Sequence, residues 1–320
     1  MQRKPLVLVG GTIKELGVGD SLAGVFARRS VVYVPSSRVW TAHADGVAVF
    51  RCVGAGGAGG HSNQVAFGGN GGTVALKTVA CAAGASFTII IPAGGVSAPS
   101  SRGGDGSTLT ITGPGVSISI PGGRGGANTS GASTQANANP AGVDWFALGG
   151  LGGRGWAGPG GGSGGGGGGP ALVVGGQAWP GGEAMGTGRG SSGACAYAAG
   201  VTAQNADAGG ETPPNLIGES NVKDGNTWAH PPMPQVDLSA SLLLINVFGC
   251  GGEPGLLPQP GGGGWVARDG GFGAGGGGGY NQGVKGGNGG RGGGGGGMFF
   301  GSGGNGGAGF VTVEFFEEQL

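Results

Sequence analysis

The sequence contains little charge, few aromatic residues and no long hydrophobic run. Of its 320 residues, 10% are charged and 7% are aromatic, and 16 basic residues balance 16 acidic ones. A chain with zero net charge and no basic cluster does not attract phosphate groups, so we expect no nucleic-acid partner. No segment approaches the ~20 apolar residues of a membrane-spanning helix. The apolar run that ends at Val9 is too short for the core of a signal peptide, so we expect the protein to mature in a cytoplasm.

Groups suited to catalysis are equally scarce. The three histidines, His43, His61 and His230, lie in no recognised catalytic signature. Residues 188–193 (GRGSSG) superficially resemble the Gly-x-Ser-x-Gly turn of hydrolases, but neither the strand before it nor the helix after it is evident. Matches to Gly-x-Gly-x-x-Gly are expected by chance at this glycine content. The sequence therefore predicts a protein that is not an enzyme and binds no cofactor.

The four cysteines are far apart in the sequence, and none forms a Cys-x-x-Cys pair. We therefore expect no zinc site at Cys52, Cys81, Cys195 or Cys250. Cys52 lies within an apolar, strand-like segment and Cys250 follows another, which suits small buried side chains. Two interpretations remain open, reduced thiols in a core and a disulfide formed after release from the cell.

Glycine is by far the most abundant residue. The 90 glycines and 18 prolines exclude a helical protein, because both residues disfavour a helix interior. A disordered chain is typically poor in apolar residues and rich in net charge. This chain is 37% hydrophobic and has no net charge. We therefore predict that the glycines are ordered.

Local composition divides the chain into four regions. Residues 1–38 contain two short predicted strands and are too few to bury a core, so we expect them to attach to a partner. Residues 39–121 carry short β-branched segments between glycine clusters, which predicts a sandwich or barrel. Residues 122–226 are rich in glycine and alanine and hold variable loops, and residues 227–320 form a second strand-rich and polyglycine block. The predicted attachment residues are Leu6, Val7, Leu8, Val9, Ile13 and Leu16.

The relation between the two strand-rich blocks stays open at this stage. They could be an internal repeat, or one sheet interrupted by a long insertion. Residues 309–315 (GFVTVEF) form a good closing strand that needs a partner. In residues 116–120 (VSISI), apolar residues alternate with serine, which places one face of that strand in water.

The polyglycine runs need another source of order, because they have no side chains to bury. A polyproline-II helix has three residues per turn and leaves every backbone N–H and C=O free to bond outward. Glycine helices of this kind can approach closely and bond laterally. In residues 286–293 (GGNGGRGG) a side chain recurs at every third position, which places the side chains on one edge. A collagen helix is disfavoured, because it needs abundant proline and these runs have none.

The fold class that we predict is mainly β, with essentially no α-helix. It combines short-stranded, sandwich-like blocks with a region of packed polyglycine helices of the polyproline-II type. Aromatic residues flanked by glycine are either contacts for a partner or plugs between segments. These candidates are Trp145, Phe146, Trp156, Trp179, Tyr197, Trp265, Phe272, Tyr280, Met298, Phe299 and Phe300.

Three parts of the sequence resemble a known family. Residues 5–22 (PLVLVGGTIKELGVGDSL) are similar to the short leader of many phage tail-fibre proteins. Residues 39–46 (VWTAHADG), a strand and the glycines at 54–60 resemble the start of their glycine-rich module, and residues 303–315 resemble its closing strand. The chain thus resembles the glycine-rich tail-fibre, tail-tip and minor tail proteins of bacteriophages.

This resemblance implies a structural protein of the virion tail that is assembled in the host cytoplasm. Its partners would be other tail or baseplate proteins and a host surface receptor, either a protein or a glycan. The sequence does not decide between a fibre tip and a baseplate position, or between a monomer and a homo-oligomer. The alternative is a bacterial glycine-rich surface or adhesin-like protein, since Gly-Gly-Asn-Gly-Gly runs such as residues 286–290 also occur there.

Overall fold

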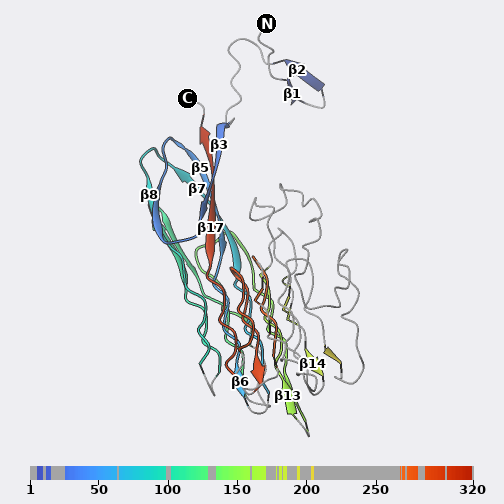
Figure 1. The fold of residues 1–320 in the computed structure, drawn as a ribbon. Coiled ribbons are helices and arrows are strands. Elements are labelled where there is room, and N and C mark those ends of the chain that lie inside the picture. The colour runs from blue at the N-terminus through green and yellow to red at the C-terminus, as the bar shows by residue number, and fades with distance from the viewer. Residues whose placement is uncertain are drawn as a thin grey trace.

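A computed structural model gives the chain an elongated shape, with a β-sandwich in one half and glycine segments in the other (Figure 1). It describes residues 6–9, 12–15, 26–62, 65–98, 102–128, 135–158, 161–170, 178, 180–181, 183–185, 193–194, 203–204, 267, 269–270, 272–279, 285–299 and 301–318. Within these ranges the fold is mainly β and contains no helix, and thus none that could span a membrane. The expectation of a β protein without α-helix is confirmed for this part of the chain.

Two antiparallel sheets form the sandwich. The larger has the strand order β11-β7-β5-β17-β3, and the smaller has the order β10-β9-β8-β4. The larger sheet consists of β3 (Phe26–Val34), β5 (Gly46–Val53), β7 (Val74–Cys81), β11 (Trp145–Ala147) and β17 (Phe310–Glu318). The smaller consists of β4 (Arg38–Thr41), β8 (Ser86–Ile90), β9 (Leu109–Gly113) and β10 (Val116–Ile120).

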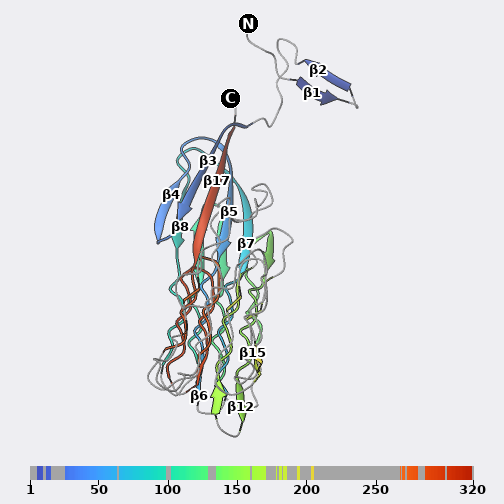
Figure 2. The same cartoon turned by 45° about the vertical axis from the view of Figure 1, so that its right-hand side comes forward.

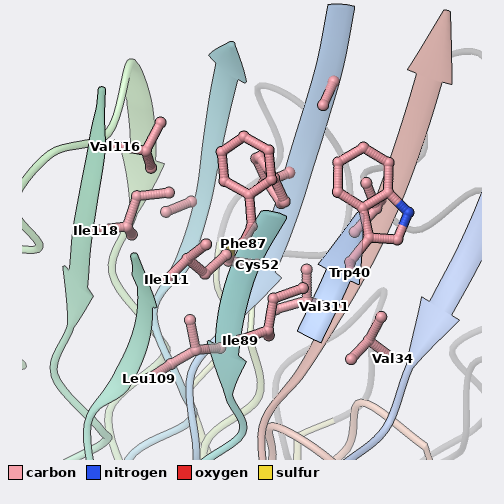
Figure 3. Packing of buried hydrophobic residues seen from close by; sticks show 14 of the residues in the cluster. Val34, Trp40, Cys52, Phe87, Ile89, Leu109, Ile111, Val116, Ile118 and Val311 are labelled. Atoms are coloured by element: carbon pink, nitrogen blue, oxygen red, sulfur yellow. The ribbon is translucent and has the colours of Figure 1, made fainter. Parts of the chain in front are cut away.

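Alternating side chains fill the space between the sheets (Figure 3). In β10, Val116, Ile118 and Ile120 are buried and Ser117 is exposed, as the two-residue alternation predicts. Trp40 lies at the centre of an aromatic cluster, with its ring centroid 5.9 Å from Phe50, 5.7 Å from Phe87 and 5.6 Å from Phe315. Both sheets contribute to this cluster, so large rings hold the two layers together.

The last described strand lies inside the larger sheet, between β5 and the edge strand β3. β17 pairs antiparallel with β5 on one side, where Phe310 faces Val53, and with β3 on the other, where Val311 faces Val34. The last described strand therefore shares a sheet with β3, which comes early in the chain. β3 belongs to residues 1–38, and it forms an edge of the sandwich.

Several strands of the sandwich continue into glycine segments (Figures 1 and 2). Residues 54–60 follow β5, residues 65–73 precede β7, residues 121–128 follow β10, and residues 301–309 precede β17. Sheets that pack through side chains lie ~10 Å apart. Beyond the sandwich the two layers bond directly, since the Gly123 N–H donates to the Ala55 carbonyl at 2.7 Å and the Ala58 N–H to that of Gly104 at 2.9 Å. The missing side chains allow this close approach.

Hydrogen bonds between glycine segments repeat every third residue. Gly54, Gly57 and Gly60 donate to the carbonyls of Thr73, Asn70 and Phe67, at 2.8, 2.9 and 2.9 Å. Gly56 and Gly59 donate to a different segment, through the carbonyls of Gly307 and Gly304. Successive N–H groups thus point to different neighbours, and one segment is bonded on several sides.

Candidate partner-binding surfaces

A separate hairpin lies at the N-terminal end of the molecule. β1 (Leu6–Val9) and β2 (Thr12–Glu15) pair antiparallel, with Val9 opposite Thr12. The hairpin is drawn outside the sandwich, near the end of β17 (Figures 1 and 2). It includes the predicted attachment residues Leu6, Val7, Leu8, Val9 and Ile13, whereas Leu16 lies outside the described residues. A two-stranded hairpin is at best marginally stable in water, so this element suits a partner.

Short strands mark the opposite end of the molecule, beyond the glycine segments (Figures 1 and 2). There β6 (His61–Ser62) pairs in parallel with β16 (Met298–Phe299), and β12 (Trp156–Gly158) pairs with β13 (Gly161–Ser163). Two further short strands, β14 (Ala184–Met185) and β15 (Ala203–Gln204), pair with each other. Burial lowers the pKa of His61, which favours the neutral imidazole at this end.

The candidate aromatic residues do not form a single patch. Trp145 and Phe146 lie in β11, at an edge of the sandwich, and Phe146 is 39% exposed. Trp156 is half-buried in β12, and Met298 is buried in β16. Of Phe299 only the backbone is described. Trp179, Tyr197, Trp265, Tyr280 and Phe300 lie outside the described residues.

Phe272 packs where the glycine segments meet the sandwich. Its ring centroid lies 5.0 Å from that of Phe310 and 6.4 Å from that of Tyr33. Arg291 lies nearby, and its Nη1 donates to the carbonyls of Pro35 at 2.9 Å and Gly309 at 3.2 Å. Burial raises the pKa of Tyr33, and the positive charge of Arg291 opposes the shift. The geometry of Phe272 therefore suits a plug between the two halves.

An ion-pair network lies on the outward side of the larger sheet. The Glu314 carboxylate is paired with Arg29 through one oxygen and with Arg51 through the other, at 2.7 Å from Nη2 of Arg51. The side chain of Glu314 is only 3% exposed, and that of Arg51 is 13% exposed. Sequence reasoning missed this network, because only the pairing of β17 with both β3 and β5 brings the three residues together.

The described cysteines are free thiols in a buried setting. Burial raises the pKa of Cys52 and Cys81, so both stay protonated and unreactive near neutral pH. Cys195 and Cys250 lie outside the described residues. In the part of the chain that is described, no three His, Cys, Asp or Glu residues are grouped as a metal site would require.

Comparisons with known proteins do not assign this chain to a family. Neither the protein-family models nor the curated proteins gave a match.

Proposed function

We propose that the glycine segments are polyproline-II helices packed into a bundle. The three-residue period of their hydrogen bonds supports this conformation, because three residues make one turn of such a helix. The close approach of neighbouring backbones supports it as well. A Cβ at Gly56 or Gly59 would lie less than 3.0 Å from the carbonyl of Gly293 or Gly296, so only glycine fits these positions.

We further propose that the protein is a structural component of a bacteriophage tail, at a fibre, tip or baseplate, and not an enzyme. The observation that carries this proposal is the separation of two ends, with a lone hairpin at one and short paired strands beyond the glycine segments at the other (Figure 1). This arrangement suits a rod that is held at one end and presents loops at the other. The leader, module start and closing strand that resemble tail-fibre proteins support the same function.

In this proposal the hairpin binds another tail or baseplate protein. The far end binds a protein or glycan receptor on the host surface. Aromatic side chains suit such contacts because rigid rings supply contact area at low entropic cost. Met298 and Phe299 lie at that end, in β16.

Removing residues 1–25 is expected to give a folded protein that no longer joins virions. The deletion ends before β3, because that strand pairs along β17 and its loss would damage the sandwich. Particles would be produced with wild-type or truncated protein, and incorporation would be measured by blotting purified virions. Circular dichroism of the isolated protein is the control for folding. Incorporation at the wild-type level would reject the attachment role.

Replacing Phe299 and Phe300 by alanine is expected to reduce adsorption to host cells at least tenfold. Phe272→Ala is the matched control, because that ring packs on Phe310 and Tyr33 and should affect stability instead. Adsorption and thermal unfolding would be measured for both variants. If the Phe299/Phe300 variant loses thermal stability and its folded fraction adsorbs normally, these rings are packing residues and the receptor assignment is wrong.

A further inference from the structure

A segment inside the glycine bundle can direct its backbone N–H groups to the carbonyls of three different neighbouring segments. Residues 67–72 are such a segment. N–H groups that are three residues apart form one set of donors, and each of the three sets bonds to a different neighbouring segment. The hydrogen bonds run from Phe67 and Asn70 to Ala127 and Arg124, from Gly68 and Gly71 to Gly153 and Gly150, and from Gly69 and Gly72 to Gly295 and Gly292. The backbone N–H groups of a segment with three such neighbours need no side-chain acceptor.

In segments nearer the surface, only two of the three sets of N–H donors bond to backbone carbonyls. In residues 286–290, Gly286 and Gly289 donate to residues 302 and 305, and Gly287 and Gly290 donate to residues 277 and 274. The remaining donor, the Asn288 N–H, bonds to Oδ1 of Asp269 at 2.6 Å. A side-chain oxygen therefore takes the place of a missing backbone carbonyl.

The neighbouring segment also uses a side-chain oxygen in place of a backbone carbonyl. In residues 304–309, two sets of donors bond to backbone carbonyls, and the third donor, the Asn305 N–H, bonds to Oδ1 of Asn288 at 3.0 Å. Oδ1 of Asn305 in turn accepts the N–H of Ser97 at 3.0 Å. Asp269, Asn288 and Asn305 thus form a ladder in which each side chain bonds the backbone of the next segment.

A second group of side chains does the same elsewhere in the bundle. Oδ1 of Asp105 accepts the Gly125 N–H at 2.7 Å, and Oδ1 of Asn137 accepts the Arg124 N–H at 3.0 Å. The repetition with a carboxylate in one case and a carboxamide in the other indicates that the acceptor oxygen is what matters.

We propose that the side chains of Asp269, Asn288 and Asn305 close an edge of the glycine bundle against a second copy of this chain. An open edge of backbone donors is a template for further pairing, as the edge of a β-sheet is. Glycine segments increase that risk, because they have no side chains to reject a wrong neighbour. A glycine segment of a second copy supplies backbone carbonyls that could accept from these donors in the same way as the segments inside the bundle do. The ladder occupies the donors first and so prevents lateral association.

The test compares association of the wild type with that of Asn288→Ala/Asn305→Ala, which frees the N–H groups of Asn305 and Ser97. Sedimentation velocity over a hundredfold concentration range is expected to give larger species for the variant than for the wild type. Asn288→Asp/Asn305→Asp keeps an acceptor oxygen at both positions and is expected to behave as the wild type. Arg154→Ala removes an exposed side chain from another segment and controls for changes in surface composition.

Both single alanine variants are included, because each loses one hydrogen bond and keeps the rest of the ladder. Circular dichroism and thermal unfolding identify the variants that retain the fold. Folded alanine variants that sediment as the wild type at every concentration would overturn the proposal. Association of the aspartate variant to the same extent as the alanine variant would overturn it as well. That result would mean that the acceptor oxygen does not prevent association.

Discussion

Replacing Gly59 by alanine is expected to lower the free energy of unfolding by at least about 3 kcal/mol, although it adds a single methyl group. The added Cβ would lie within 3.0 Å of the carbonyl group of Gly296 and the nitrogen of Gly297. These are backbone atoms that neighbouring segments hold in place, since Gly296 donates to Gly287 and Gly297 to Gly165. The clash therefore cannot be relieved by rotation of a side chain.

The adjacent residue provides a matched control. Ala58 lies in the same segment and is fully buried, so a methyl group is accepted at that position. Ala58→Gly should cost only about 1 to 2 kcal/mol, from the lost methyl contact and the added freedom of the unfolded chain. The double variant Ala58→Gly/Gly59→Ala moves the methyl by one residue and keeps the composition, and it should be as unstable as Gly59→Ala. Denaturant unfolding would measure all three, and equal losses for Ala58→Gly and Gly59→Ala would contradict the close packing of these segments.

Replacing Glu314 by alanine is expected to destabilise the sandwich by about 2 to 3 kcal/mol. Breaking a buried ion pair from one side typically costs more, but the Arg29 side chain is 53% exposed and water screens part of its charge. The larger share of the loss comes from Arg51, which is 13% exposed and would remain without its carboxylate partner. Because Glu314 joins β17 to both β3 and β5, its loss weakens two strand pairs.

Glu318→Ala serves as the control, because it removes the same type of side chain from the exposed end of the same strand. It should change stability by no more than about 0.5 kcal/mol. A double-mutant cycle with Arg51→Ala would separate the pairing energy from the loss of packing. A Glu314→Ala variant as stable as Glu318→Ala would mean that the network contributes nothing measurable.

The positions of several strands of the sandwich could be predicted from the sequence, but their pairing could not. Residues 47–53 form a short apolar run, which predicts a strand. Residues 116–120 also alternate at the strand period, so the buried face of that strand follows from local pattern. The partner of the closing strand could not be predicted in this way. Local sequence does not specify which of several similar strands will pair with Phe310–Glu318, and the sheet places it between β5 and β3.

The candidate sites were predictable to a smaller extent. The apolar run at residues 6–9 predicted a strand, but its hairpin partner at residues 12–15 was not predicted. The glycine flanks selected Trp145, Phe146 and Trp156 as candidates. The flanking glycines do not show whether an aromatic residue packs between segments or contacts a partner. Only the ring distances place Phe272 against Phe310 and Tyr33. The roles of Arg291 and Asn288 were missed, because the three-residue period gives the edge on which they lie and not the group that each one meets.

The sequence by itself determined that the chain has no helix-forming composition, that its apolar segments form strands, and that its glycine runs repeat with a period of three. These properties are local, because they depend on backbone freedom and on the spacing of side chains along one segment. The tertiary structure decided which segments are neighbours. It thereby decided the position of β17 between β5 and β3, the Glu314 network and the ladder of Asp269, Asn288 and Asn305. Those features join residues up to 285 positions apart, and their partners are chosen by the packing of the whole chain.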